Sequence, residues 1–304
     1  MFIPLFYPLS HRFFYFCSVK NQYLTSEYLQ KFIELSMEED LGDGDHSTVA
    51  TIPKEMTGIA RLIAKEPGTI AGIEMAQLIF DKVDCSMKVV KKVEDGAEVQ
   101  AGDLIMELKG KVRSILSTER FLLNVMQRMS GIATRTHKLV AMLEGTETRI
   151  LDTRKTTPFL RPIEKWAVAI GGGSNHRFGL FDMVMLKDNH IDYSGGIANA
   201  VAKTRQYLAE QNKKLRIEVE TRTLTEVRAA LESKADVIML DNMDTATMKE
   251  AVEIIGSRAE TEASGGVTEE NLREVAECGV DFISIGALTH SVKSLDISLK
   301  AEIN

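Results

Sequence analysis

A dense group of cationic side chains marks one stretch of an otherwise acidic sequence. Guanidinium and ammonium groups pair with carboxylates and phosphates through charge-assisted hydrogen bonds. A surface basic patch is the simpler explanation, but here the cations are separated by Gly, Thr, Asn and Pro instead of further lysines. The stretch therefore predicts a site for a ligand with several negative charges. Its 37 residues contain Arg154, Lys155, Arg161, Lys165, His176, Arg177, Lys187 and His190.

In the following third of the chain, the candidate site residues are mainly acids and glycines. The carboxylates of Glu220 and Asp241 suit sugar hydroxyls or a Mg²⁺ ion that carries phosphates. Ser264–Gly266 and Gly286-Ala287 leave backbone N–H groups that can bind phosphate. An anionic small molecule on one side and a magnesium-bound sugar phosphate on the other indicate a transferase.

These polar residues follow apolar segments that alternate with helical patterns from Arg149 onward. Such alternation predicts a parallel sheet, and the absence of a GxGxxG turn favours a barrel over a dinucleotide fold. Active sites of α/β barrels lie at the carboxyl ends of the strands, where the polar residues of this chain fall. The expected strands are Ile150-Leu151, Met183–Leu186, Leu215–Val219, Val237–Leu240, Glu260–Ala263 and Phe282–Ile285. The expected helices are 196–211, 224–233, 245–255 and 268–277.

The region before the barrel has a different pattern. Residues 57–114 indicate short strands around a helix, Ile73 to Val83, with a last strand in KVRSIL. A long helix is expected from Ser117 to about Leu143. One of its faces carries a single cation among uncharged groups, and we favour a buried role at a site or a subunit contact over a solvated face. That face comprises Arg120, Asn124, Gln127, Gly131 and Thr134.

Two short segments have ambiguous roles. The acidic run Glu39–Asp45 fits a solvated turn best, with a cation site or a helix cap as alternatives. Residues 1–18 are aromatic and lack the features of a signal peptide, so we expect an overhang outside the core. The expected domains are 19–127 and the barrel, 128–289. The alternative that residues 290–304 pack back on the first domain stays open.

Composition excludes several classes of protein. With 304 residues, 44% hydrophobic and 27% charged, the chain is neither disordered nor fibrous. A formal net charge of −7 argues against a general nucleic-acid binder, and no apolar run is long enough to span a membrane. Three widely separated cysteines form no disulfide framework or metal pair, which favours a cytoplasmic protein.

The string DTRKTTPFLRPIEKWAVAIGGGSNHRFGLFDMVMLKDNH resembles the quinolinate phosphoribosyltransferase family. The resemblance extends through EEDLGDGDHST, ERFLLNVMQRMSGIATRT, IEVE, IMLDN, EASGG and ISIGALTHS, nearly all of residues 25–300. It implies an N-terminal α/β sandwich followed by an incomplete α/β (TIM-like) barrel. It also implies transfer of the phosphoribosyl group of phosphoribosyl pyrophosphate to quinolinate, with Mg²⁺. The products would be nicotinate mononucleotide, pyrophosphate and CO₂, in NAD biosynthesis.

The resemblance also implies roles for individual residues. Glu220 and Asp241 would handle the metal, and with Lys155 they would act in catalysis. The family works as a homodimer or larger assembly, and its arginine at position 120 completes the neighbouring subunit's site. One departure is Phe159, where the family usually has glycine, which puts the local loop shape in doubt. Quinolinate would be bound by Arg120, Thr153, Arg154, His176, Arg177 and Lys187. Phosphoribosyl pyrophosphate would be bound by Lys155, Glu220, Asp241, Ser264, Gly265, Gly266, Ile285, Gly286 and Ala287.

Three rival functions remain. A related protein associated with molybdenum uptake shares the fold, but the intact TRKTT and NHR strings disfavour it. A barrel aldolase would use Lys187 as a Schiff base. A non-catalytic paralogue should have lost part of the ring of charged residues, and none is missing.

Overall fold

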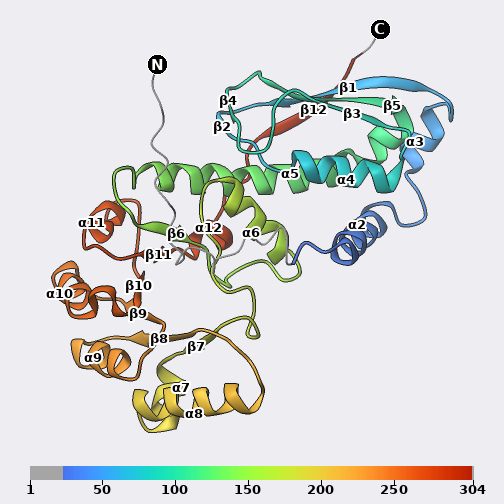
Figure 1. The fold of residues 1–304 in the computed structure, drawn as a ribbon. Coiled ribbons are helices and arrows are strands. Elements are labelled where there is room, and N and C mark those ends of the chain that lie inside the picture. Colours follow the sequence, from blue (N-terminus) through green and yellow to red (C-terminus); the bar gives the residue numbers. More distant parts are fainter. Residues whose placement is uncertain (1–22, 303–304) are drawn as a thin grey trace, which may run out of the picture.

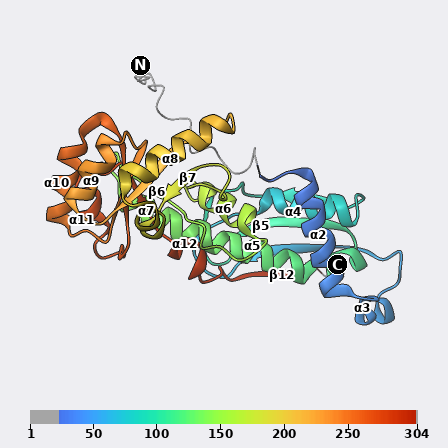
Figure 2. The same ribbon diagram turned by 90° about the horizontal axis from the view of Figure 1, so that it is seen from below.

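The computed structural model describes residues 23–302, which form two parts joined by one long helix (Figure 1). The expected overhang, residues 1–18, lies outside the described residues. Figure 2 shows the two parts side by side, with the barrel on the left and the N-terminal part on the right. Within residues 23–302, no helix is both long and apolar enough to cross a membrane.

Two short helices precede the first sheet. Helix α2 (Ser26–Leu41) begins at Thr25, whose side chain accepts a hydrogen bond from Tyr28 N–H, and ends at Gly42. Helix α3 (His46–Thr51) begins at Asp45, whose carboxylate accepts from Thr48 N–H. The acidic run therefore caps a helix, which was one of its three predicted roles.

The N-terminal part is an antiparallel sheet laid over helices. Its strands are β1 (Thr57–Ala64), β3 (Lys88–Lys91), β5 (Leu104–Lys111) and β12 (Ile297–Glu302), in the order β12-β1-β5-β3. Figure 1 shows this sheet above α4 (Ile73–Val83) and α5 (Val112–Ala141). A two-stranded sheet, β2 (Gly68–Thr69) with β4 (Glu98–Val99), lies at one end. This is the expected sandwich, and its edge strand β12 comes from the end of the chain.

The second part is a sheet of six parallel strands in the order β6-β11-β10-β9-β8-β7. The end strands β6 and β7 do not pair with each other, so the barrel is incomplete, as predicted. The strands are β6 (Arg149–Leu151), β7 (Val184–Leu186), β8 (Ile217–Thr221), β9 (Val237–Asp241), β10 (Glu260–Ser264) and β11 (Phe282–Ser284). The connecting helices are α6 (Arg161–Ile170), α7 (Asp188–Ser194), α8 (Ile197–Glu210), α9 (Leu224–Glu232), α10 (Thr245–Ile255), η1 (Gly256–Arg258), α11 (Leu272–Ala276) and α12 (Ala287–His290).

Helix α5 joins the two parts and corrects one sequence prediction. The strand expected in KVRSIL is wrong, because Val112 already begins the helix and Ile115 is buried by it. Three residues of the uncharged face, for which we expected a buried role at a site or a subunit contact, contact their own chain. Gln127 Nε2 donates to Ile297 O (2.8 Å), and Thr134 Oγ1 accepts from Thr69 N–H (2.8 Å). A Cβ on Gly131 would lie 2.3 Å from Lys293 O, so glycine lets the C-terminal segment cross the helix there.

Candidate active site

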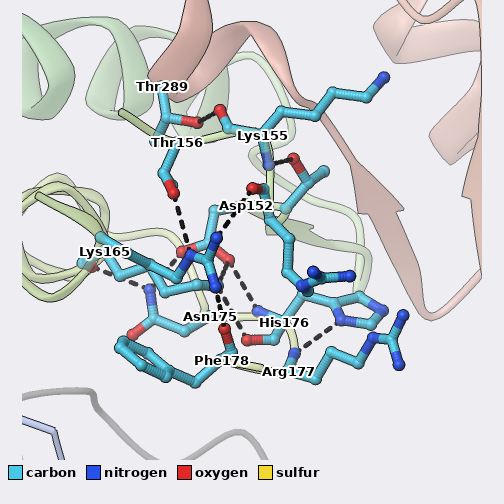
Figure 3. Close-up of polar contacts among 12 residues, drawn as sticks. Asp152, Lys155, Thr156, Lys165, Asn175, His176, Arg177, Phe178 and Thr289 are labelled. Carbon is cyan, nitrogen blue, oxygen red and sulfur yellow. Dashed lines mark hydrogen bonds and ion pairs between the residues drawn. The ribbon is translucent and has the colours of Figure 1, made fainter. Parts of the chain in front are cut away.

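The loop that follows β6 carries three of the predicted ligand-binding residues to the barrel mouth. Thr153 Oγ1 accepts a hydrogen bond from Lys155 N–H (3.0 Å), and Thr289 Oγ1 donates to Lys155 O (2.8 Å). The side chains of Arg154 and Lys155 are exposed. In Figure 3 the Lys155 side chain extends away from the buried residues beneath the loop. The backbone is thus fixed while both cationic ends stay available to a ligand.

A buried ion pair supports this loop from below (Figure 3). Lys165 Nζ pairs with Asp152 and also donates to His176 O (2.9 Å), and both side chains are fully buried. Asp152 further accepts from Asn175 Nδ2 (2.6 Å) and from His176 N–H (2.9 Å). Burial raises the pKa of Asp152 and lowers the pKa of Lys165, and their mutual attraction opposes both changes. Lys165 was expected among the ligand-binding cations, and its burial shows that this expectation is wrong.

His176 lies in the barrel interior between two acids. Its Nε2 is 3.0 Å from Glu218 Oε2 and 3.3 Å from Glu262 Oε2, and all three side chains are buried. Burial alone lowers the pKa of His176, but Glu262 and Glu218 outweigh it and raise the pKa to about 10. Burial, and then repulsion from Glu262, raises the pKa of Glu218 to about 7. The cluster therefore retains a proton near neutral pH that the separate groups would not.

The same cluster is the group of described residues whose donor atoms could hold a metal ion. One atom from each of His176, Glu218 and Glu262 lies within 4.8 Å of the others. Arg177 N–H donates to His176 Nδ1 (2.6 Å), which leaves Nε2 and the carboxylates to share the retained proton. That proton reduces the repulsion between the Glu218 and Glu262 carboxylates, which a bound metal ion would otherwise reduce.

Three arginines around the mouth repel one another. Burial lowers the pKa of Arg177, and the charge of Arg154 lowers it further. The same two causes, in the same order, lower the pKa of Arg161. Arg161 donates to Thr156 Oγ1 (2.9 Å) and Phe178 O (2.9 Å), so it braces the loop. Within residues 23–302, no carboxylate forms an ion pair with Arg154, Lys155 or Arg177, and a bound anion would relieve their repulsion.

The later strands bring the predicted acids to the same edge of the sheet. Glu220, near the end of β8, pairs with Lys187, which follows β7 (3.1 Å). Asp241 ends β9, and its carboxylate accepts from Asn242 Nδ2 (2.9 Å). Both are oxygen donors of the kind that Mg²⁺ prefers, so their chemistry fits a magnesium ion at this edge.

The backbone amides predicted to bind phosphate are not equivalent. Ile285 N–H donates to Leu151 O (2.9 Å), so it belongs to the sheet and is not available to a ligand. The N–H groups of Gly265, Gly266 and Gly286 have no backbone acceptor within the described chain. Ala287 begins α12, and Ser264 ends β10. A Cβ on Gly286 would lie 2.9 Å from Lys155 Cδ, so glycine lets the lysine stem cross the start of α12.

Arg120 lies on α5, outside the barrel strands and loops that carry the other predicted site residues. It is exposed on the N-terminal half of α5, where Asn124 is also exposed. Arg128, two turns further on, contacts Glu164 (2.7 Å) and Thr289 O (2.7 Å). A helix rises 1.5 Å per residue, so Arg120 lies about 12 Å along the axis from Arg128.

Sequence reasoning missed Glu262 and gave Glu218 no role. A signal was present for Glu218, which stands between Ile217 and Val219 in IEVE, whereas the polar neighbours of Glu262 in ETEAS gave none. Alternation along a strand turns such a residue toward the barrel interior, where a charge needs a partner.

Two family descriptions match the chain over nearly its whole described length. "Quinolinate phosphoribosyl transferase, N-terminal domain" matches residues 45–130. "Quinolinate phosphoribosyl transferase, C-terminal domain" matches residues 132–300. The boundary between them lies inside α5.

Curated relatives and solved structures agree with this match. The chain is 50% identical to a chloroplastic nicotinate-nucleotide pyrophosphorylase [carboxylating] of Oryza sativa, over 90% of this chain and 78% of the relative. It is 42% identical to a probable nicotinate-nucleotide pyrophosphorylase of Bacillus subtilis, over 91% of this chain and 94% of the relative. The nicotinate-nucleotide pyrophosphorylase of Francisella tularensis has a TM-score of 0.84 at 37% identity, covering 92% of this chain and 98% of that one.

Proposed function

Since the chain belongs to the quinolinate phosphoribosyltransferase family, we propose that its barrel mouth binds quinolinate and magnesium phosphoribosyl pyrophosphate in two adjacent halves. The chain shares the activity for which its relatives are named, which forms nicotinate mononucleotide from quinolinate and phosphoribosyl pyrophosphate with loss of pyrophosphate and CO₂.

The observation that carries the proposal is the set of cations without ion-pair partners. Arg154 lowers the pKa of Arg177, and neither has a carboxylate partner among residues 23–302. Quinolinate carries two carboxylates, which would supply the missing negative charge. In the proposal Thr153, Arg154, Arg177 and Lys187 contact quinolinate directly, while the buried His176 holds Arg177 through the backbone hydrogen bond.

The second half of the mouth takes the sugar phosphate. Lys155 and the free amides of Gly265, Gly266 and Gly286 would bind phosphate oxygens. Glu220 and Asp241 would bind the ribose hydroxyls and hold Mg²⁺ with the pyrophosphate. Bound Mg²⁺ would neutralise charge on the leaving pyrophosphate.

The remaining chemistry is electrostatic positioning. The cations hold the pyridine nitrogen in line with the anomeric carbon of ribose, and a C–N bond forms as the C–O bond to pyrophosphate breaks. The ribosylated nitrogen is positive, so it stabilises the electron pair left on C2 when CO₂ departs. C2 then takes up a proton. No side chain has to act as a nucleophile.

The proposal includes a homodimer in which Arg120 completes the neighbouring site. Support comes from its exposure and from its position about 12 Å along α5 from Arg128, away from its own mouth. Gln127, Gly131 and Thr134 contact their own chain. On the polar face of α5, the proposed subunit contact is therefore supported by Arg120 and Asn124.

Purified protein tests the assignment directly. We expect pyrophosphate release that requires quinolinate and Mg²⁺, with nicotinate a poor replacement. Arg177→Ala should lower quinolinate turnover severely. Efficient use of nicotinate by the unmutated protein would exclude the assignment, and borohydride trapping at Lys187 would favour an aldolase.

Subunit mixing tests the role of Arg120. Arg120→Ala and Arg154→Ala proteins should each be nearly inactive. After dissociation and reassembly, half of the dimers carry one site with both arginines, so activity should recover to about a quarter of the unmutated level. Proven exchange without recovery would place Arg120 outside the partner's site.

A cytoplasmic location is also part of the proposal. The free thiols of Cys85 and Cys278 support a reducing compartment. The rice relative is described as chloroplastic, so cell fractionation with a tagged full-length chain is the deciding measurement.

A further inference from the structure

Phe159 has a backbone conformation that suits glycine. Its φ is 70°, in the left-handed region that bulky residues rarely adopt. The ring is about half exposed, so burial of the ring alone does not explain the conformation. Something in this chain must hold the strained turn.

Helix α2 supplies the contacts that hold it. Tyr28 Oη donates a hydrogen bond to Phe159 O (2.8 Å). The Tyr28 and Phe159 rings lie 5.4 Å apart at 54°, and Phe32 lies 6.4 Å from Phe159. Phe32 in turn lies 5.6 Å from Phe121 of α5. A line of aromatic contacts therefore ties the turn at Phe159 to the long helix; we call Tyr28, Phe32 and Phe159 the aromatic clasp.

The clasp closes the loop that presents two predicted substrate ligands. Arg154 and Lys155 lie only four or five residues before Phe159. The intervening backbone is fixed at Thr157, whose N–H donates to Glu164 Oε2 (3.1 Å), and Leu160 N–H donates to Thr157 O (3.1 Å). A change in the peptide at Phe159 would therefore reach the loop through a short, bonded segment.

Empty space behind the clasp makes such a change possible. A cavity of about 290 Å³ lies between α2, α5 and α6, and its lining includes Phe32, Leu160 and Arg128. Tightly packed surroundings would prevent the turn from relaxing without help from Tyr28. Because a cavity lies next to the turn, the hydrogen bond from the Tyr28 hydroxyl contributes more to holding the turn in place.

We propose that Tyr28 and Phe159 are positioning residues: the Tyr28 hydroxyl holds the strained turn at Phe159 and so fixes the loop that carries Arg154 and Lys155. The inference rests on the proposed function of that loop. It implies that Phe159 makes the chain depend on Tyr28, whereas glycine at the same position would remove that dependence.

The test is a rescue experiment. Tyr28→Phe removes one hydroxyl and keeps the ring. It should raise the KM for quinolinate or phosphoribosyl pyrophosphate about three- to tenfold, with kcat changed less than twofold. Adding Phe159→Gly relieves the strained φ and should return KM to within about twofold of the unmutated value. Tyr207→Phe, at a half-exposed residue of α8, is the matched control and should change neither constant.

Amide hydrogen exchange provides a readout that does not need activity. Exchange at residues 154–159 should accelerate in Tyr28→Phe and slow again in the double variant. Unchanged KM and unchanged exchange in Tyr28→Phe would overturn the inference, as would a double variant no better than Tyr28→Phe. An unmutated protein without quinolinate-dependent activity would instead refute the proposed function, and the exchange data would still decide the role of the clasp.

Discussion

Two sets of charged residues lie within a few residues of each other in the sequence yet behave differently in the barrel. Asp152 and Lys165 are fully buried and paired beneath the mouth. Arg154 and Lys155 stand at the rim, exposed and without an ion-pair partner in the described chain. The first set stabilises the loop beneath the mouth, and the second set is available to bind an anion.

The difference teaches that residue type and sequence position do not assign a role in this motif. Lys165 belongs to the same cationic stretch as Lys155, but its ammonium group has its hydrogen bonds satisfied inside the protein. Lys155 has only its backbone bound, which leaves the side chain free. Loss of a buried partner should therefore reduce stability, and loss of a rim cation should reduce activity alone.

Removal of one member of the buried pair should produce the largest effect. Lys165→Met leaves Asp152 with an uncompensated buried charge, and the free energy of unfolding should fall by about 3–5 kcal/mol. Urea denaturation measures this change. Lys203→Met, at an exposed residue of α8, is the control and should change stability by less than about 1 kcal/mol. A loss below about 1 kcal/mol in Lys165→Met would erase the distinction between the two sets.

The buried cluster around His176 should make stability depend on pH. Its pKa of about 10 is raised above the ordinary value of 6.5, and the Glu218 pKa of about 7 is raised above 4.5. Both groups bind protons more tightly in the folded state. The stabilisation from His176 is therefore complete below pH 6.5 and is lost as pH rises through 10, and that from Glu218 is complete below pH 4.5 and is lost as pH rises through 7.

Because the two groups share a proton, their contributions do not add. We expect the free energy of unfolding to fall by on the order of 3 kcal/mol between pH 6 and pH 10. Denaturation of the unmutated protein and of His176→Asn at several pH values measures the difference. Equal slopes in both proteins would show that the cluster contributes nothing to this dependence.

Removal of a rim cation should affect binding and leave stability intact. Arg154→Ala should be nearly inactive, and Lys155→Ala, which loses a charged hydrogen bond of about 1.5–3 kcal/mol, should lower kcat/KM about 10- to 150-fold. Unfolding free energies should stay within about 0.5 kcal/mol of the unmutated value. Steady-state kinetics and denaturation on the same preparations separate the two. A large loss of stability would place these residues with the buried set.

The ion pair between Lys187 and Glu220 at the rim should contribute least to the free energy of unfolding. Lys187 is about half exposed, and its bond to Glu220 is screened by water. Lys187→Ala should change the unfolding free energy by less than about 1 kcal/mol, although turnover falls. A loss of 2 kcal/mol or more would indicate a structural pair like that of Lys165.

Much of the architecture could be predicted from the sequence, because local patterns of apolar segments and turns indicate each helix and strand. The helix Ile73–Val83 matches α4, and the six strands of the barrel appear where expected. The helix start at Val112 could not be predicted, because VRSIL also fits a strand and only packing decides between them. The same holds for the partners of Gln127 and Thr134, which come from distant segments.

The sequence predicted which residues form the candidate site, but not the burial and hydrogen-bond partners of each residue. Strand ends identified Arg154, Glu220 and Asp241, whose positions follow from the geometry of a parallel sheet. The burial of His176 between Glu218 and Glu262 depends on which way three side chains point inside the barrel. The strained φ of Phe159 likewise appears only when the turn and α2 are seen together.

The pairing of β12 with β1 has a consequence for the order of events during synthesis. Strand β1 emerges from the ribosome early, and its partner β12 emerges only after the whole barrel has been made. Until then one edge of β1 exposes backbone groups that can pair with other chains. Contacts between such distant segments also slow folding. The nascent N-terminal sheet is thus exposed to aggregation at that edge until β12 has been made.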